Sequence, residues 1–194
     1  MAPTAKAVEG ANALAKRDRL LRGALKSYGV PDLRRGRPRR THFAELTRMI
    51  CYQQLAGRAA AAIYGRFEAL FDGPPTPDLV LALPMDELRS VGLSGSKAAS
   101  IVDLAEKVDV GLVQLDRMSR LPDEEVVREL TLVRGIGEWT AHMFLMFTLH
   151  RGDVLPTGDQ GIKNAVKQAY GLAAVPKPDA MIELDLDLEE ARLR

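Results

Sequence analysis

The sequence is poor in several features that whole classes of protein depend on. Its 194 residues include one cysteine, one tryptophan and only 5% aromatic residues. The single cysteine, Cys51, excludes a disulfide framework, an intrachain zinc cluster and a four-cysteine iron–sulfur cluster. No apolar run is long enough to form a membrane-spanning helix, and the first residues lack a signal-peptide pattern. We therefore expect an intracellular protein of a reducing compartment, in the cytoplasm or nucleoid if bacterial, with no membrane partner and no metal site.

The sequence also lacks an excess of either sign of charge, because its formal net charge is only +1. The overall charge therefore does not point to a polyanionic partner, but the charges are unevenly distributed. Five arginines precede the first strongly apolar segment, and five acids lie close to the C-terminus: Arg34, Arg35, Arg37, Arg39 and Arg40, and Glu183, Asp185, Asp187, Glu189 and Glu190. The arginine run is either a solvated arm or a set of phosphate contacts.

Helical periodicity, in contrast, is present along most of the chain. Apolar residues recur every three to four positions in segments separated by glycine and proline. The pattern predicts helices over residues 14–28, 43–55, 58–71, 77–83, 85–91, 96–108, 123–132, 138–149 and 160–170. No segment alternates with a period of two, so the predicted fold class is all-α, in one domain or two small lobes. Residues 1–13 are small and polar to neutral, and we expect them to be disordered.

The stretch from Leu132 to Lys163 carries the strongest functional signal. It reads LVRGIGEWTAHMFLMFTLHRGDVLPTGDQGIK. Gly135 and Gly137 form a hairpin in which no Cβ prevents close approach of another backbone. The N-terminus of the helix that follows offers free N–H groups to an anion such as phosphate. A Gly/Pro loop then ends at a single acid, Asp159. The segment therefore combines a grip for a nucleic-acid backbone with one carboxylate.

Four segments match blocks of a known family, in order, over roughly 130 residues, which is far more specific than one glycine pair. LVRGIGEWTA matches the hairpin L-x-G-I-G-x-W-T-A, and DVLPTGDQGIK matches the loop D-V-x-P-x-x-D-x-G-I/L-K/R. Residues 42–67 and 91–106 match two upstream blocks. The chain thus resembles the helix-hairpin-helix-GPD superfamily of DNA glycosylases, and within it the short, all-helical 3-methyladenine DNA glycosylase II family. This resemblance implies a two-lobed helical fold with a helix-hairpin-helix motif and a central cleft.

The resemblance also sets the expected domain limits. It assigns residues 14–172 to the glycosylase domain and leaves residues 173–194 as an atypical acidic C-terminal tail. Relatives continue past this point into a helix with a W-x-P-x-R-[ST] motif, which helps to wall the pocket. Here the tail reads AAVPKPDAMIELDLDLEEARLR and contains no tryptophan.

Asp159 is the catalytic residue that the resemblance implies. Cleavage of an N-glycosidic bond builds positive charge on the sugar, and one carboxylate near the anomeric carbon stabilises that charge and orients or deprotonates water. Asp153 is the competing acid, but it precedes the Pro156 turn and more readily suits a structural pairing. Asp159 also suits the N-cap of the helix over residues 160–170, and capping would fix the position of its carboxylate.

Further residues are expected to contact DNA. The resemblance implies that backbone N–H groups of Gly135 and Gly137 bind a phosphate, that Thr140 adds a hydroxyl contact, and that hairpin carbonyls can hold a monovalent cation. A side chain must fill the gap that a flipped nucleotide leaves. In the family it comes from the Q-Q-L-S turn, where Gln54 matches best here and Leu55 is the second choice. A basic residue of the last block, Lys163, reads as a phosphate contact or as surface charge.

The flipped base needs an aromatic or apolar wall, and an electron-rich wall favours a cationic base. Trp139, Tyr52 and Met143 are the candidates for this base pocket. For Trp139, packing under the hairpin is the simpler interpretation, and Met143 occupies a position that is aromatic in some relatives.

These features together predict a monofunctional glycosylase of the DNA-3-methyladenine glycosylase II type. We expect it to act as a monomer on double-stranded DNA with alkylated bases, with no cofactor required. Relatives that also cut the strand carry a lysine two residues past the second hairpin glycine, where this chain has Trp139, so no lyase activity is expected. The alternative is a catalytically weak or inactive helix-hairpin-helix DNA-binding protein.

Overall fold

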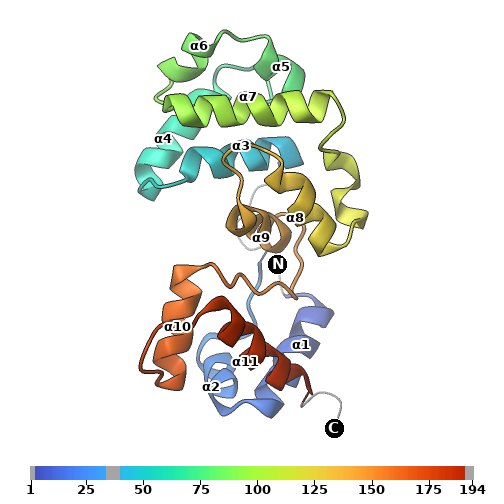
Figure 1. Ribbon diagram of the computed structural model, residues 1–194, viewed down its shortest axis with the longest axis vertical. Helices are drawn as coiled ribbons and strands as arrows, with labels where there is room; N and C mark the ends of the chain where they lie inside the picture. Colours follow the sequence, from blue (N-terminus) through green and yellow to red (C-terminus); the bar gives the residue numbers. More distant parts are fainter. Residues whose placement is uncertain (1–2, 34–39, 191–194) are drawn as a thin grey trace. The chain divides into compact units, whose positions relative to one another are not determined.

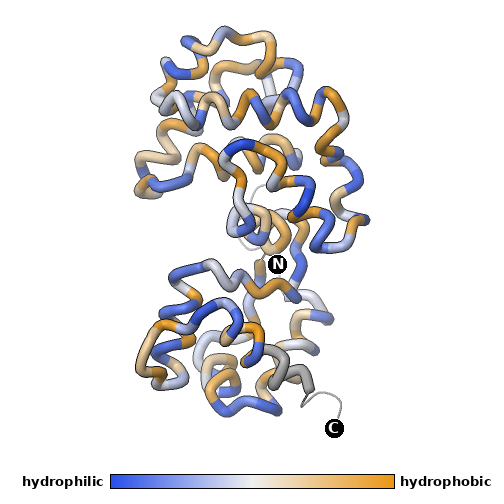
Figure 2. The backbone as a smooth tube through the Cα atoms, viewed as in Figure 1, coloured by the Kyte–Doolittle hydropathy of each residue, from blue (hydrophilic) through white to orange (hydrophobic). Residues whose placement is uncertain are grey.

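The computed structural model describes residues 3–33 and 40–190, and it is built of helices and loops without a strand in these ranges (Figure 1). The all-α prediction is therefore confirmed. The chain divides into two compact units, residues 38–149 and residues 1–37 with 150–194, as the two-lobed expectation required. Hydrophobic and hydrophilic residues alternate along the helices of both units, which is the pattern of amphipathic helices packed around a core (Figure 2). The expected cleft stays a prediction.

The unit of residues 38–149 holds the hairpin. Its elements are α3 (His42–Tyr52), α4 (Gly57–Glu68), α5 (Pro77–Leu81), α6 (Met85–Ser90), α7 (Gly95–Asp109), the 3₁₀ helix η1 (Leu115–Arg120), α8 (Asp123–Thr131) and α9 (Glu138–Phe147). Helix α7 lies between α5 and α3, and α8 packs against α9 (Figure 1). The core of this unit is fully buried and includes Leu46, Ile50, Phe67, Leu104 and Phe144.

Local sequence sets the start of the two helices on which the hairpin rests. The Thr41 hydroxyl caps α3 by accepting the Ala44 N–H at 3.1 Å, and the Ser94 hydroxyl caps α7 by accepting the Lys97 N–H at 3.3 Å. The His42 ring, with Nδ1 2.8 Å from the Leu115 carbonyl oxygen, fastens the start of α3 to η1. These caps and contacts place α3 and α7 as fixed supports.

The second unit holds Asp159. Its helices are α1 (Ala5–Arg17), α2 (Arg19–Tyr28), α10 (Gln160–Tyr170) and α11 (Pro178–Glu190). Asp18 caps α2 by accepting the N–H groups of Leu20 and Leu21, and it also accepts the Tyr170 hydroxyl at 3.0 Å. Burial and this hydrogen bond raise the pKa of Tyr170 to about 12. The Asp18 carboxylate therefore joins the start of α2 to the end of α10.

Three expectations about this unit were wrong. Residues 5–13, expected to be disordered, form most of α1, because Thr4 caps the helix and Ala15 is buried. The single helix expected over residues 14–28 is interrupted at Asp18, whose extended backbone and capping side chain begin a new helix. Residues 173–190 are not an appendage, since α11 belongs to this unit and Met181 is buried in it.

Candidate functional site

The hairpin, residues 132–137, connects α8 to α9 and requires glycine at Gly135. The Ile136 N–H donates to the Val133 carbonyl at 3.1 Å, which closes the turn, and the Ile136 side chain is buried. Gly135 has φ +76°, and a Cβ there would lie 2.5 Å from the Ser100 hydroxyl oxygen on α7. The left-handed backbone of Gly135 and its closeness to Ser100 both exclude a side chain at this position. The structure thus explains Gly135 by packing on α7.

Gly137 has a different environment. It is exposed, its φ is −97°, and a Cβ would meet nothing within 4 Å. It is the N-cap of α9 and provides no side-chain cap for that helix. The first N–H groups of α9 therefore lie at an open surface, which is the arrangement expected of an anion-binding helix start. Nothing in the surrounding structure requires glycine at this position.

Two side chains outside the hairpin hold it in place. On α7, the Asp103 carboxylate pairs with Lys107 and accepts the Arg134 N–H at 2.7 Å. From the turn after α3, the Gln53 side-chain nitrogen Nε2 donates to the Gly135 carbonyl at 2.9 Å. This hydrogen bond occupies one of the two lone pairs of the Gly135 carbonyl oxygen. Neither contact could be predicted from the sequence, because residues 53 and 135, like residues 103 and 134, are far apart in the chain.

The turn after α3, residues 53–56, is called here the QQL turn. Gln54 is exposed and has φ +55°, an uncommon conformation for a residue other than glycine. Leu55 is 40% exposed although it is apolar. The Lys97 ammonium donates to the Cys51 carbonyl at 2.8 Å and so fixes the end of α3. The turn therefore projects both predicted gap-filling residues, Gln54 and Leu55, from a fixed support.

Thr140, a predicted DNA contact, lies on the buried face of α9. Its side chain is only 4% exposed, and its hydroxyl oxygen lies 3.5 Å from the Gln53 Nε2. Thr140 is therefore buried beside Gln53, and its contact with DNA stays a prediction. The reason for this burial is helical geometry: Thr140 and Phe144 lie one turn apart on the face of α9 that packs into the core.

Asp159 is the N-cap of α10, as the capping alternative predicted. Its Oδ1 accepts the Ile162 N–H at 2.8 Å, and its backbone N–H donates to the Pro156 carbonyl at 2.8 Å. Gly161 leaves room for this carboxylate, because a Cβ at that position would lie 3.1 Å from Oδ1. Asp159 is half-buried and held at a defined orientation, whereas the competing Asp153 is exposed. Lys163 is half-buried on the first turn of α10.

The three base-pocket candidates are all accessible in part. Trp139 is 46% exposed on the first turn of α9, so packing under the hairpin does not hide it. Tyr52 and Met143 are half-buried. The Arg48 guanidinium lies 4.9 Å from the centre of the Tyr52 ring and therefore covers one ring face. A cationic base would be repelled at that face.

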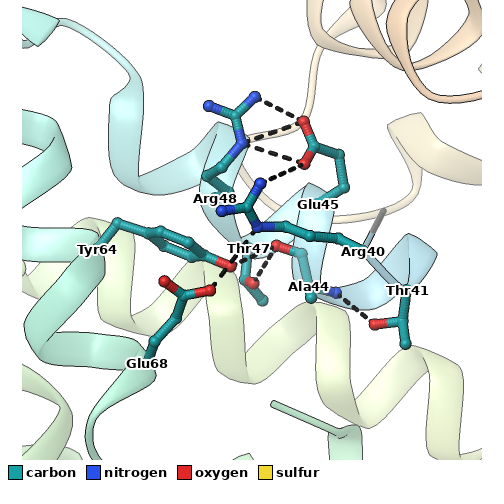
Figure 3. Close-up of polar contacts among 8 residues, drawn as sticks. All are labelled: Arg40, Thr41, Ala44, Glu45, Thr47, Arg48, Tyr64 and Glu68. Carbon is teal, nitrogen blue, oxygen red and sulfur yellow. Dashed lines mark hydrogen bonds and ion pairs between the residues drawn. The ribbon is translucent and has the colours of Figure 1, made fainter. Parts of the chain in front are cut away.

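Arg48 belongs to a charged cluster that the sequence did not reveal (Figure 3). The buried Glu45 carboxylate accepts the Arg48 Nε–H, which is shared between its two oxygens, and a second hydrogen bond from Nη2, and these contacts raise the pKa of Arg48. Arg40 lies 4.0 Å from Glu45, 3.7 Å from Glu68 and over the Tyr64 ring. Of the arginine run, Arg34 to Arg39 lie outside the described residues, and Arg40 is engaged within the protein.

Residues 3–33 and 40–190 contain no group of three or more acidic, histidine or cysteine side chains that would hold a metal ion. No helix within these ranges is both long and apolar enough to cross a membrane.

Comparisons with known proteins agree with one another. Residues 47–188 match the family described as "HhH-GPD superfamily base excision DNA repair protein". The match continues past residue 172, the predicted domain limit. DNA-3-methyladenine glycosylase 1 of Schizosaccharomyces pombe is 35% identical over 137 residues, which cover 69% of this chain and 60% of that protein. The putative DNA-3-methyladenine glycosylase YfjP of Bacillus subtilis is 30% identical over 151 residues, covering 74% of this chain and 53% of that protein.

Solved structures of 3-methyladenine DNA glycosylases also resemble this chain. The S. pombe 3-methyladenine DNA glycosylase in complex with abasic DNA superimposes with a TM-score of 0.75 at 30% identity, covering 90% of this chain and 86% of that one. DNA-3-methyladenine glycosidase of Bacillus halodurans superimposes with a TM-score of 0.80 at 30% identity, covering 91% and 80%. The chain spans 60% and 53% of the length of the two curated relatives above.

Proposed function

Since this chain belongs to the HhH-GPD superfamily of base excision DNA repair proteins, we propose that it is a monofunctional DNA glycosylase that removes alkylated bases of the 3-methyladenine type from double-stranded DNA. One observation carries the proposal: Asp159 is held as a helix N-cap at the end of the loop that matches the family's D-V-x-P-x-x-D block. A helix cap alone does not require a charge, because asparagine and serine cap as well as aspartate, so the carboxylate in the matched loop favours an enzyme over a non-catalytic DNA-binding protein.

The hairpin supplies the grip on DNA. The exposed start of α9 presents N–H groups to a phosphate, and Gly137 leaves the surface open for the DNA backbone. Contacts of this kind fix the register of the protein on the duplex without reading sequence, which suits an enzyme that must inspect many sites. Lys163, half-buried on α10, is expected to contribute charge to the same backbone binding.

Asp159 supplies the chemistry. As the C1′–N bond breaks, the bond electrons leave with the base and positive charge develops on the sugar. A carboxylate held by the Ile162 N–H stabilises this charge without having to reorient, and it positions the attacking water. A base that alkylation has made cationic leaves as a neutral molecule, so the leaving group needs little further help. Hydrolysis of this kind requires no organic cofactor.

The QQL turn fills the gap in the stack. Gln54→Ala should slow base excision from duplex DNA by several fold while leaving binding to undamaged duplex within about twofold, because the side chain acts only once a nucleotide has left the stack. The measurement is single-turnover excision beside equilibrium binding of a matched undamaged duplex. An unchanged excision rate would move the role to Leu55, whose Leu55→Ala variant provides the direct comparison.

The reaction should leave the DNA strand uncut. A strand-cutting glycosylase attacks C1′ with an amine, and borohydride then traps the resulting Schiff base as a covalent adduct. The matching position here is Trp139, which has no amine, so borohydride added during turnover should trap no protein–DNA adduct. A trapped adduct would show that another amine, with Lys163 the nearest in sequence after Asp159, reaches the sugar.

The proposal is tested with a synthetic duplex that carries one alkylated or deaminated base. The protein should convert it into an abasic duplex that stays intact until hot alkali cleaves the strand at that position. Tight binding to the lesion duplex without alkali-sensitive product would identify a lesion-binding protein and reject the glycosylase.

A further inference from the structure

Gln53 connects two elements that the proposed function assigns to DNA. It is the C-cap residue of α3 and the first residue of the QQL turn, immediately before Gln54. Its side chain is half-buried, with Nε2 2.9 Å from the Gly135 carbonyl oxygen and 3.5 Å from the Thr140 hydroxyl oxygen. A carbonyl can only accept a hydrogen bond, so the amide nitrogen, and not its oxygen, must face the hairpin.

Hydrogen bonds also hold the QQL turn in place. The Gln53 N–H donates to the Ile50 carbonyl at 3.3 Å, and the Leu55 N–H donates to the Tyr52 carbonyl at 3.4 Å. Lys97 holds the Cys51 carbonyl, and Gln54 has a left-handed φ of +55°. Gln53, Gln54 and Leu55 therefore belong to one short, hydrogen-bonded turn.

The hairpin side is equally constrained. Asp103 holds the Arg134 N–H, and Ser100 lies directly against Gly135, so α7 fixes one side of the hairpin. The Gly135 carbonyl is the part of the hairpin that reaches Gln53. This contact and the Thr140 contact join the QQL turn to the hairpin and α9 through side-chain hydrogen bonds.

We propose that Gln53 is a positioning residue that couples insertion of the QQL turn into DNA to phosphate binding by the hairpin. This inference rests on the proposed function, because it takes the hairpin and the QQL turn as the two DNA-binding elements. Gln53 itself need not touch DNA. Its hydrogen bond sets the distance between the gap-filling residues and the gripped backbone, so both can engage the same duplex in register.

The expected effect is specific to nucleotide flipping. Gln53→Leu keeps the approximate size and removes the donor, and it should slow single-turnover excision from duplex DNA about three- to tenfold, the loss expected for one neutral hydrogen bond. Binding to undamaged duplex and the thermal midpoint should change little. The matched control is Gln114→Leu, because Gln114 is an exposed glutamine whose amide also donates to a glycine carbonyl, Gly111, at 3.2 Å. This control should behave as wild type.

Gln53→Glu distinguishes a hydrogen bond from mere packing. Glutamate has nearly the shape of glutamine, but its carboxylate cannot donate and repels the Gly135 carbonyl oxygen. We therefore expect Gln53→Glu to be slower than Gln53→Leu at pH 8. The defect should shrink towards pH 5, since the protonated acid can donate and the carbonyl favours that form. A purely steric role would make glutamate the milder change at every pH.

A double-mutant cycle tests the coupling itself. If Gln53 acts by placing the QQL turn, Gln54→Ala should cost less in the Gln53→Leu background than in wild type. Independent, multiplying losses would overturn the coupling.

Hydrogen exchange of residues 132–137 in the free protein gives a readout without catalysis, and it should be faster in Gln53→Leu than in Gln114→Leu. Equal exchange rates in the two variants would reject the coupling between the QQL turn and the hairpin, even if the protein were an active glycosylase. Absence of base release by the wild-type protein, together with faster exchange in Gln53→Leu, would reject the proposed function and leave this coupling standing.

Discussion

Asp159→Asn should reduce base release by about 10²–10³-fold or more, the range found when a group that stabilises transition-state charge is removed. Asparagine keeps the size of the side chain and caps a helix as well as aspartate does, so the Ile162 hydrogen bond and α10 should persist. Binding to lesion duplex should stay within a few fold of wild type. Single-turnover release from an alkylated duplex, measured beside equilibrium binding, checks both parts.

Asp153→Asn is the matched control, because Asp153 lies in the same loop region and is exposed. It should release base at the wild-type rate. A wild-type rate for Asp159→Asn, or a large loss for Asp153→Asn, would remove Asp159 from its assigned role.

Gly137→Leu should weaken binding to undamaged and lesion duplex alike, by about tenfold or more, while the protein stays folded. The structure has open space around a Cβ at Gly137 and an ordinary backbone there, so the substitution itself causes no strain. The added side chain would instead stand between the start of α9 and a phosphate. The slope of log Kd against log salt should become shallower because fewer phosphate contacts form.

Gly135→Val should act on the fold, because valine strongly disfavours φ +76° and its Cβ would clash with Ser100. Its thermal midpoint should fall, whereas that of Gly137→Leu should not. Gly65→Leu, at an exposed position in α4 with nothing near the added side chain, is the control for bulk alone and should bind as wild type. Loss of affinity for lesion duplex only would show that the hairpin contacts the base and not the backbone.

Local patterns explain which parts of this structure were predictable. The helix after the hairpin and the cap at Asp159 were predicted correctly, because periodicity and capping depend on residues within one or two turns. The break at Asp18 was missed since the apolar spacing continues across it, and only the capping chemistry of aspartate marks a new start. The disorder expected over residues 1–13 rested on their small, polar composition, although the Thr4 cap and the alanines favour a helix.

Contacts between distant segments could not be predicted in this way. Nothing near Gln53 in sequence indicates that its amide reaches Gly135, and nothing near Asp103 indicates the Arg134 N–H. The burial of Thr140 was predictable in principle, since it shares the core face of α9 with Phe144. The Arg48 contact with Tyr52 joins neighbours on one helix turn, a spacing that marks a possible pair without identifying it.

The most direct test of the central claim is chromatographic identification of the base released from DNA that carries radioactive methyl groups. We expect the wild-type protein to release labelled 3-methyladenine, Asp159→Asn to release almost none, and the strand to remain uncut before alkali treatment. Failure of the wild-type protein to release any labelled base, or equal release by the two proteins, would contradict this claim.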